Sequence, residues 1–162
     1  WGRIRCSISL RTCDFFNIIY VLENRKSRHK RRMIMKTFIY VTTQFEDMHS
    51  YPDAPEEVAF LRVPHRHMFH VEATIEVGHL DRELEFILVK RELDKMCSAV
   101  KDVIKTEAKS CERFATYLAR ALSKKYGWLI DNTGFERSRE IIIKVNEDGE
   151  NGAIFYSKGG EL

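Results

Sequence analysis

The sequence lacks three features that would point to a membrane, a secreted or a nucleic-acid-binding protein. No run of 18 apolar residues occurs, so we expect no segment to span a membrane. The four cysteines form no Cys-x-x-Cys pair, which suits reduced thiols in a cytoplasmic protein better than a disulfide framework. Residues 35–162 also lack net positive charge, since they hold 18 Lys and Arg against 22 Asp and Glu. Nucleic acid is therefore not expected as a partner of this part of the chain.

Residues 1–34 differ from the rest of the chain. They hold nine Lys and Arg against two Asp and Glu, and their apolar stretch at 15–22 precedes the basic block at 25–32. A signal peptide has the opposite order, with its charges first. We predict that residues 1–34 are an extension, disordered or not native to the protein, and that residues 35–162 form one domain. The alternative is a basic arm that binds nucleic acid or a membrane surface.

The first half of the predicted domain has the composition of two strands. Residues 35–44 are rich in Val, Thr, Tyr, Phe and Ile, and residues 67–77 alternate between apolar and polar side chains. Between them, Pro52 and Pro55 predict an irregular loop, because proline fixes its own φ and restricts the residue before it.

The second half predicts two helices and a hairpin. Apolar residues recur at helical spacing over 87–104, and Ser110 suits the N-cap of a second helix that ends near Gly127. Residues 140–146 and 153–156 then predict a β-hairpin around a turn rich in Gly and Asn. The expected fold is α+β, a four-stranded antiparallel sheet with two helices packed on one face. Its expected order is strand, strand, helix, helix, strand, strand.

Three histidines predict a metal centre. His65 and His67 lie two residues apart at the start of the second predicted strand, and residues two apart on a strand point to the same face. Both imidazoles can therefore bind one metal ion, while His49 completes the site from the neighbouring strand. Three neutral nitrogen ligands with an open fourth position suit a catalytic zinc. The other interpretation of His-x-His is a pair of exposed strand histidines.

Further motifs surround these histidines. Phe45-x-x-x-His49 lies on the first strand and His-x-His-x-x-x-Val on the second, the pair Glu85-Phe86 precedes the first helix, and one Glu follows at the start of the second helix and another in the last hairpin. This order resembles the 6-pyruvoyl-tetrahydropterin synthase and 6-carboxytetrahydropterin synthase family, which usually has Asp-Phe in place of Glu85-Phe86. The resemblance covers about residues 36–156. It implies the tunnelling fold, in which three chains close a β-barrel and two trimers stack into a hexamer with active sites between subunits.

The resemblance also implies ligands. It assigns zinc to His49, His65 and His67, and a reduced pterin to Glu112 and Glu147. A carboxylate can accept two parallel hydrogen bonds from the adjacent donors on the pyrimidine edge of a pterin. Without the resemblance, Glu112 would be interpreted as a first-turn carboxylate favoured by the helix dipole and Glu147 as a turn residue.

The family's proton-transfer groups have no counterpart here. Leu61 occupies the place of the catalytic Cys, four residues before the first His of His-x-His, and no Asp-His pair occurs within 101–110. Glu56, Glu57 and Cys111 are the candidate replacement bases. A carboxylate could accept the proton if burial raised its pKa, and a thiol if its neighbours lowered its own pKa.

Together these patterns favour an enzyme over a binding protein. We expect a cytoplasmic, zinc-dependent lyase that resembles 6-carboxytetrahydropterin synthase and acts on a reduced pterin such as dihydroneopterin triphosphate, in queuosine or deazapurine biosynthesis. The alternative is a non-catalytic pterin- or purine-binding homologue that keeps the metal and the pocket without the base.

Overall fold

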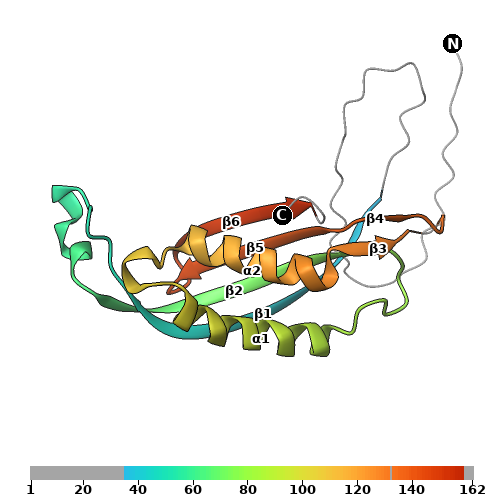
Figure 1. The fold of residues 1–162 in the computed structure, drawn as a ribbon, viewed down its shortest axis with the longest axis horizontal. Helices are drawn as coiled ribbons and strands as arrows, with labels where there is room; N and C mark the ends of the chain where they lie inside the picture. The colour runs from blue at the N-terminus through green and yellow to red at the C-terminus, as the bar shows by residue number, and fades with distance from the viewer. Residues whose placement is uncertain (1–34, 132, 159–162) are drawn as a thin grey trace, which may run out of the picture. The chain divides into compact units, whose positions relative to one another are not determined.

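The computed structural model describes residues 35–131 and 133–158, so the prediction for residues 1–34 lies outside the described residues. By internal contacts the chain divides between Met35 and Lys36. The second unit is built on a four-stranded antiparallel sheet in the order β1, β2, β5, β6 (Figure 1). Its strands are β1 (Thr37–His49), β2 (His65–Val77), β5 (Glu140–Glu147) and β6 (Asn151–Lys158).

Two helices pack on one face of this sheet, α1 (Phe86–Val103) and α2 (Cys111–Tyr126). The Glu85 carboxylate caps α1 by accepting from the Ile87 backbone N–H at 3.2 Å. Ser110 caps α2, as predicted, by accepting from the backbone N–H of Arg113. Both helices bury one apolar stripe against the sheet, because their inward residues recur every three or four positions.

The core lies between the helices and the odd-numbered residues of the strands. Alternation along each strand sends every second side chain to this face, so Phe69, Ala73 and Ile75 of β2 are fully buried. At the end of the sheet where β1 finishes, the core is aromatic. Phe69 lies 5.4 Å from Phe45 and 4.8 Å from Phe114 between ring centroids. These three rings form an aromatic cluster in the core at this end of the sheet.

The α+β class and the four-stranded antiparallel sheet are confirmed. The structure adds four short elements that the sequence pattern did not predict: the hairpin of β3 (Trp128–Ile130) and β4 (Glu136–Ser138), and the 3-10 helices η1 (Glu56–Arg62) and η2 (Thr106–Ala108). Both long strands also extend beyond their predicted bounds, β1 to His49 and β2 back to His65. Among the described residues, no helix is both long and apolar enough to cross a membrane.

Candidate metal centre

The extended strands bring the three histidines together. His49 is the last residue of β1 and pairs directly with His65, the first residue of β2. His67 follows two residues later on the same face. The ring centroids are 4.5 Å apart for His49 and His65, and 5.0 Å for each of the other two pairs. A potential ligand atom from each residue lies within 4.8 Å of the others, so the triad can converge on one metal ion.

Each imidazole is oriented by an oxygen atom behind it. The Nδ1 of His49 lies 2.7 Å from the backbone oxygen of Lys109, and that of His65 lies 2.8 Å from the backbone oxygen of Val63. The Nδ1 of His67 contacts the Asp148 carboxylate. Carbonyl and carboxylate oxygens accept hydrogen bonds, so each Nδ1 carries the hydrogen. In the neutral ring this leaves Nε2 with a free lone pair, which is the form that binds a metal.

Two of these lone pairs have no partner in the described part of the chain. The Nε2 atoms of His49 and His65 are buried and accept no hydrogen bond. A buried polar atom without a partner typically costs about 1 to 3 kcal/mol. A zinc ion would satisfy both atoms, and three neutral nitrogens leave its fourth tetrahedral position open for water or a substrate oxygen. The donor set therefore fits zinc. The centroid of the buried Phe69 ring lies 5.6 Å from that of the His49 ring.

A buried ion pair holds the loop behind His49 in place. The Lys109 ammonium lies 2.8 Å from both carboxylate oxygens of Asp47, and the two side chains are 7% and 11% exposed. Asp47 is two residues before His49 on β1, and the Lys109 backbone oxygen accepts from the His49 ring. In addition, the Ser50 backbone N–H donates a hydrogen bond to the Thr106 backbone oxygen at 3.3 Å. The connection between α1 and α2 is thus fixed against the end of β1.

Glu147 lies beside the triad, at the end of β5. Its Oε1 is 3.7 Å from the His49 Nδ1 and 3.7 Å from the Cys111 Sγ. Burial, with the neighbouring Glu147 charge, raises the pKa of the Cys111 thiol to about 12. Cys111 is therefore a neutral thiol at physiological pH. This disfavours the hypothesis that its thiolate serves as a base.

The other candidate site residues lie at the surface of this chain. Glu56 and Glu57 are exposed on η1, and Glu56 forms a 3.0 Å ion pair with Arg62. Glu112 is exposed in the first turn of α2. Among the described residues, no hydrogen bond or ion pair joins Glu56, Glu57 or Glu112 to the triad. Of the predicted carboxylates, only Glu147 is brought to the histidines by contacts within the described part of the chain.

Sequence reasoning missed Asp148, which follows Glu147 in the turn between β5 and β6. Its carboxylate accepts from the His67 ring and, at 2.9 Å, from the Met68 backbone N–H. The hydrogen bonds from His67 and from Met68 hold the pKa of Asp148 below its usual range. The sequence offers an Asp-Gly pair, which predicts only a tight turn. Nothing in it links that turn to a histidine 81 residues away.

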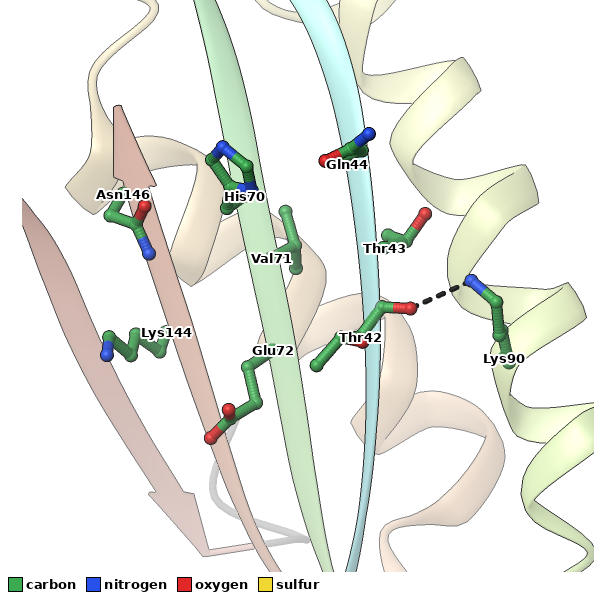
Figure 2. A pocket seen from close by; sticks show the side chains of 9 residues that line it. All are labelled: Thr42, Thr43, Gln44, His70, Val71, Glu72, Lys90, Lys144 and Asn146. Atoms are coloured by element: carbon green, nitrogen blue, oxygen red, sulfur yellow. Dashed lines mark hydrogen bonds between the residues drawn. The ribbon is translucent and has the colours of Figure 1, made fainter. Parts of the chain in front are cut away.

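The opposite face of the sheet carries a different set of polar side chains. His70 points away from the triad, as alternation along β2 predicts, and lines a hollow of about 460 Å³ (Figure 2). Gln44 and Asn146 flank His70 on the neighbouring strands, and Glu72 lies opposite Lys144. This hollow is separated from the triad by the sheet, so His70 is not part of the candidate metal centre.

Comparison of the sequence with models of known protein families finds no match, and comparison with curated proteins finds none either. The family resemblance thus depends on the motif residues and on the histidine geometry alone.

Proposed function

We propose that this protein is a zinc-dependent lyase of the 6-carboxytetrahydropterin synthase type, which acts on a reduced pterin such as dihydroneopterin triphosphate in queuosine or deazapurine biosynthesis. The observation that carries the proposal is the triad of His49, His65 and His67. Its rings converge, each Nδ1 donates to an oxygen, and two buried Nε2 lone pairs have no partner among the described residues. Bound zinc would supply Lewis-acid polarisation of the substrate's side-chain oxygens.

Glu147 is the residue of this chain best placed to orient the pterin. Its carboxylate borders the triad and is 26% exposed, so a ligand can reach it. One oxygen accepts weakly from the Cys111 thiol, which leaves acceptor capacity for the donor pair on a pterin edge. The neutral Cys111 thiol adds no competing charge. Glu147 would thus bind the ring while the triad holds the side chain near zinc.

Glu112 forms no hydrogen bond or ion pair with the triad among the described residues, so its role in holding the pterin is proposed for an assembly of several chains. Its carboxylate is exposed in the single chain, away from the triad's hydrogen bonds. We propose the homohexamer that the tunnelling fold implies, a dimer of trimers in which sites form between subunits. The outer strands of the four-stranded sheet, β1 and β6, leave backbone groups that could pair with a second copy.

A non-catalytic pterin- or purine-binding protein is the second candidate. One observation favours it: none of the candidate bases is in an environment suited to proton transfer at the triad. Cys111 is held neutral, Glu56 and Glu57 are exposed, and Leu61 cannot accept a proton. A positioned general base typically contributes about 10²- to 10⁴-fold to the rate. We therefore expect turnover to be slow even if zinc and pterin both bind.

Metal analysis followed by incubation with dihydroneopterin triphosphate tests the proposal. We expect about one zinc per chain, and none in the His65→Ala/His67→Ala double variant, since two of three ligands are gone. His70→Ala is the matched control, because this histidine lies on the other face of the same strand and should leave zinc content unchanged. A wild-type protein that holds no zinc, or a double variant that keeps it, would rule out the triad as the site.

Pterin binding separates the two candidate functions. Glu147→Ala should weaken binding by roughly tenfold to a hundredfold, the range for loss of a charge-assisted hydrogen bond at about 1.5 to 3 kcal/mol. Binding with measurable product formation supports the lyase. Binding with no product supports the non-catalytic homologue. Absence of pterin binding by the zinc-loaded protein would contradict the lyase and the pterin-binding homologue, and would leave only a purine-binding homologue.

A further inference from the structure

We propose that Asp148 is a positioning residue for the metal centre, which fixes the His67 ring so that its Nε2 faces the metal. This inference rests on the proposed zinc site, and it assigns a function to a turn residue that the family resemblance does not include. Its Oδ2 contacts the His67 Nδ1, while its Oδ1 accepts from the Met68 N–H at 2.9 Å.

The turn that carries Asp148 is built to hold the carboxylate still. Asp148 and Gly149 have φ values of 52° and 82°, and the Glu150 N–H donates to the Glu147 oxygen at 2.9 Å, which closes a β-turn within the three-residue connection between β5 and β6. Aspartate is one of the few residues that adopts positive φ at low cost. The Asp148 N–H also donates to the Met68 oxygen at 2.8 Å. Backbone and side chain thus join the turn to β2 at the residue next to His67.

The triad is oriented by two backbone oxygens and by one side-chain carboxylate, that of Asp148. His49 and His65 donate to backbone oxygens of Lys109 and Val63, which no substitution removes directly. Asp148 is a side chain and a charged one. A carboxylate behind a metal-bound imidazole fixes the tautomer and raises the basicity of the ligand. We therefore expect removal of the Asp148 carboxylate to change the orientation of the His67 ring and to leave the backbone of β2 and β5 unchanged.

Asparagine at this position would meet a conflict that aspartate does not. Both groups that face Asp148, the Met68 N–H and the His67 Nδ1–H, are donors. The amide has one accepting oxygen, so its NH₂ must face one of the two. The Met68 N–H can only donate, whereas the neutral His67 ring can carry its hydrogen on either nitrogen, so the amide oxygen should face Met68 and the NH₂ should face His67. The NH₂ then donates to Nδ1, and the ring hydrogen moves to Nε2, the atom that would bind the metal. Asp148→Asn thus keeps the shape and turn preference of the side chain but favours the wrong tautomer.

The experiment is a zinc competition titration against a chelator with the full chain. We expect Asp148→Asn and Asp148→Gly to bind zinc about 10- to 100-fold more weakly than wild type. Glycine keeps the turn because it accepts positive φ readily. Glu150→Gln is the matched control, since it removes an exposed carboxylate from the same turn without touching a histidine. Equal affinity in wild type, Asp148→Asn and Asp148→Gly would overturn the positioning role.

A second measurement keeps this inference distinct from the zinc proposal. Long-range ¹H–¹⁵N spectra of the metal-free protein report which nitrogen of each histidine carries hydrogen. We expect His67 to hold its hydrogen on Nδ1 in wild type and in Glu150→Gln, with a larger Nε2–H population in Asp148→Asn. Absence of zinc binding with this tautomer pattern would end the zinc proposal alone. Zinc binding with His67 protonated on Nε2 in the metal-free wild type would overturn the role of Asp148.

Discussion

The two ends of the four-stranded sheet both bury polar groups, but they do so differently. At the end opposite the triad, the Glu76 side chain is fully buried, and its two oxygens lie 2.9 Å and 2.6 Å from the Arg137 guanidinium. The Glu140 backbone N–H also donates to it at 3.1 Å. Arg139 is paired with Glu83, and Lys36 with Glu140. Three carboxylates thus meet three cations.

At the triad end the balance is incomplete within the described residues. Asp47 and Lys109 pair with each other there, but two imidazole nitrogens are buried without partners. Glu147 faces a thiol and an imidazole instead of a cation. A polar network satisfied within the chain stabilises the fold, whereas one that leaves convergent lone pairs is suited to bind something else. This contrast distinguishes a structural cluster from a candidate site more sharply than burial does.

The largest loss of stability should come from a substitution in the paired network at the end of the sheet opposite the triad. Glu76→Gln leaves Arg137 without its carboxylate, and removal of one partner from a buried pair costs about 3 to 5 kcal/mol. Because Arg137 is 35% exposed and can be partly hydrated, we expect the lower end of that range in urea unfolding. Zinc affinity should not change. Glu46→Gln is the control, since its pair with Arg66 is exposed and worth about 0 to 1 kcal/mol.

Equal destabilisation by the two variants would show that the buried network is not a structural support. A loss of zinc affinity in Glu76→Gln would show that the two ends of the sheet are coupled.

The sequence predicted the parts of this contrast that depend on periodicity. Alternation along β2 placed His65 and His67 on one face and His70 on the other, and Ser110 marked the start of α2. These are local rules, so one strand or one helix end contains all the information they need.

Contacts between distant segments could not be predicted in this way. The Arg137 and Glu76 pair depends on the β3–β4 hairpin, which is too short and too mixed in composition to show a strand pattern. The Lys109 and Asp47 pair and the Asp148 contact to His67 join residues 62 and 81 positions apart. Local periodicity does not fix the register that brings such residues together. The sequence therefore predicted which histidines come together but not the groups that orient them.

A smaller effect should appear in the pH dependence of stability, through Glu83 in the paired network opposite the triad. Burial opposes ionisation of Glu83, but hydrogen bonds from the Gly78 N–H and from Arg139 outweigh it and lower the Glu83 pKa below its ordinary value. The folded state therefore binds this proton less readily than the unfolded chain. The resulting stability is present above the ordinary pKa of 4.5 and is lost as the pH falls through the lower folded value.

Urea unfolding between pH 6 and pH 3, with chelator present, measures this contribution. Glu83→Gln should be less stable than wild type near pH 6 and should lose less stability on acidification. Glu57→Gln, which changes an exposed carboxylate on η1, should follow the wild-type curve. Parallel curves for wild type and Glu83→Gln would mean that Glu83 contributes no pH-dependent stability.

The smallest effect should appear in the alkylation rate of Cys111, at the triad end of the sheet. Burial contributes most to its raised pKa of about 12, and the Glu147 charge comes next. Glu147→Gln removes that charge but not the burial, so the thiol pKa should fall only part of the way to its ordinary value. The thiolate fraction should rise about tenfold for each pH unit by which the pKa falls. Iodoacetamide alkylation at pH 8, in a background with the other three cysteines changed to Ser, measures the thiolate fraction. Glu112→Gln should accelerate the reaction less, because the Glu112 charge raises the thiol pKa less than Glu147 does. Equal rates in wild type and Glu147→Gln would mean that the Glu147 charge does not contribute to the raised pKa of Cys111.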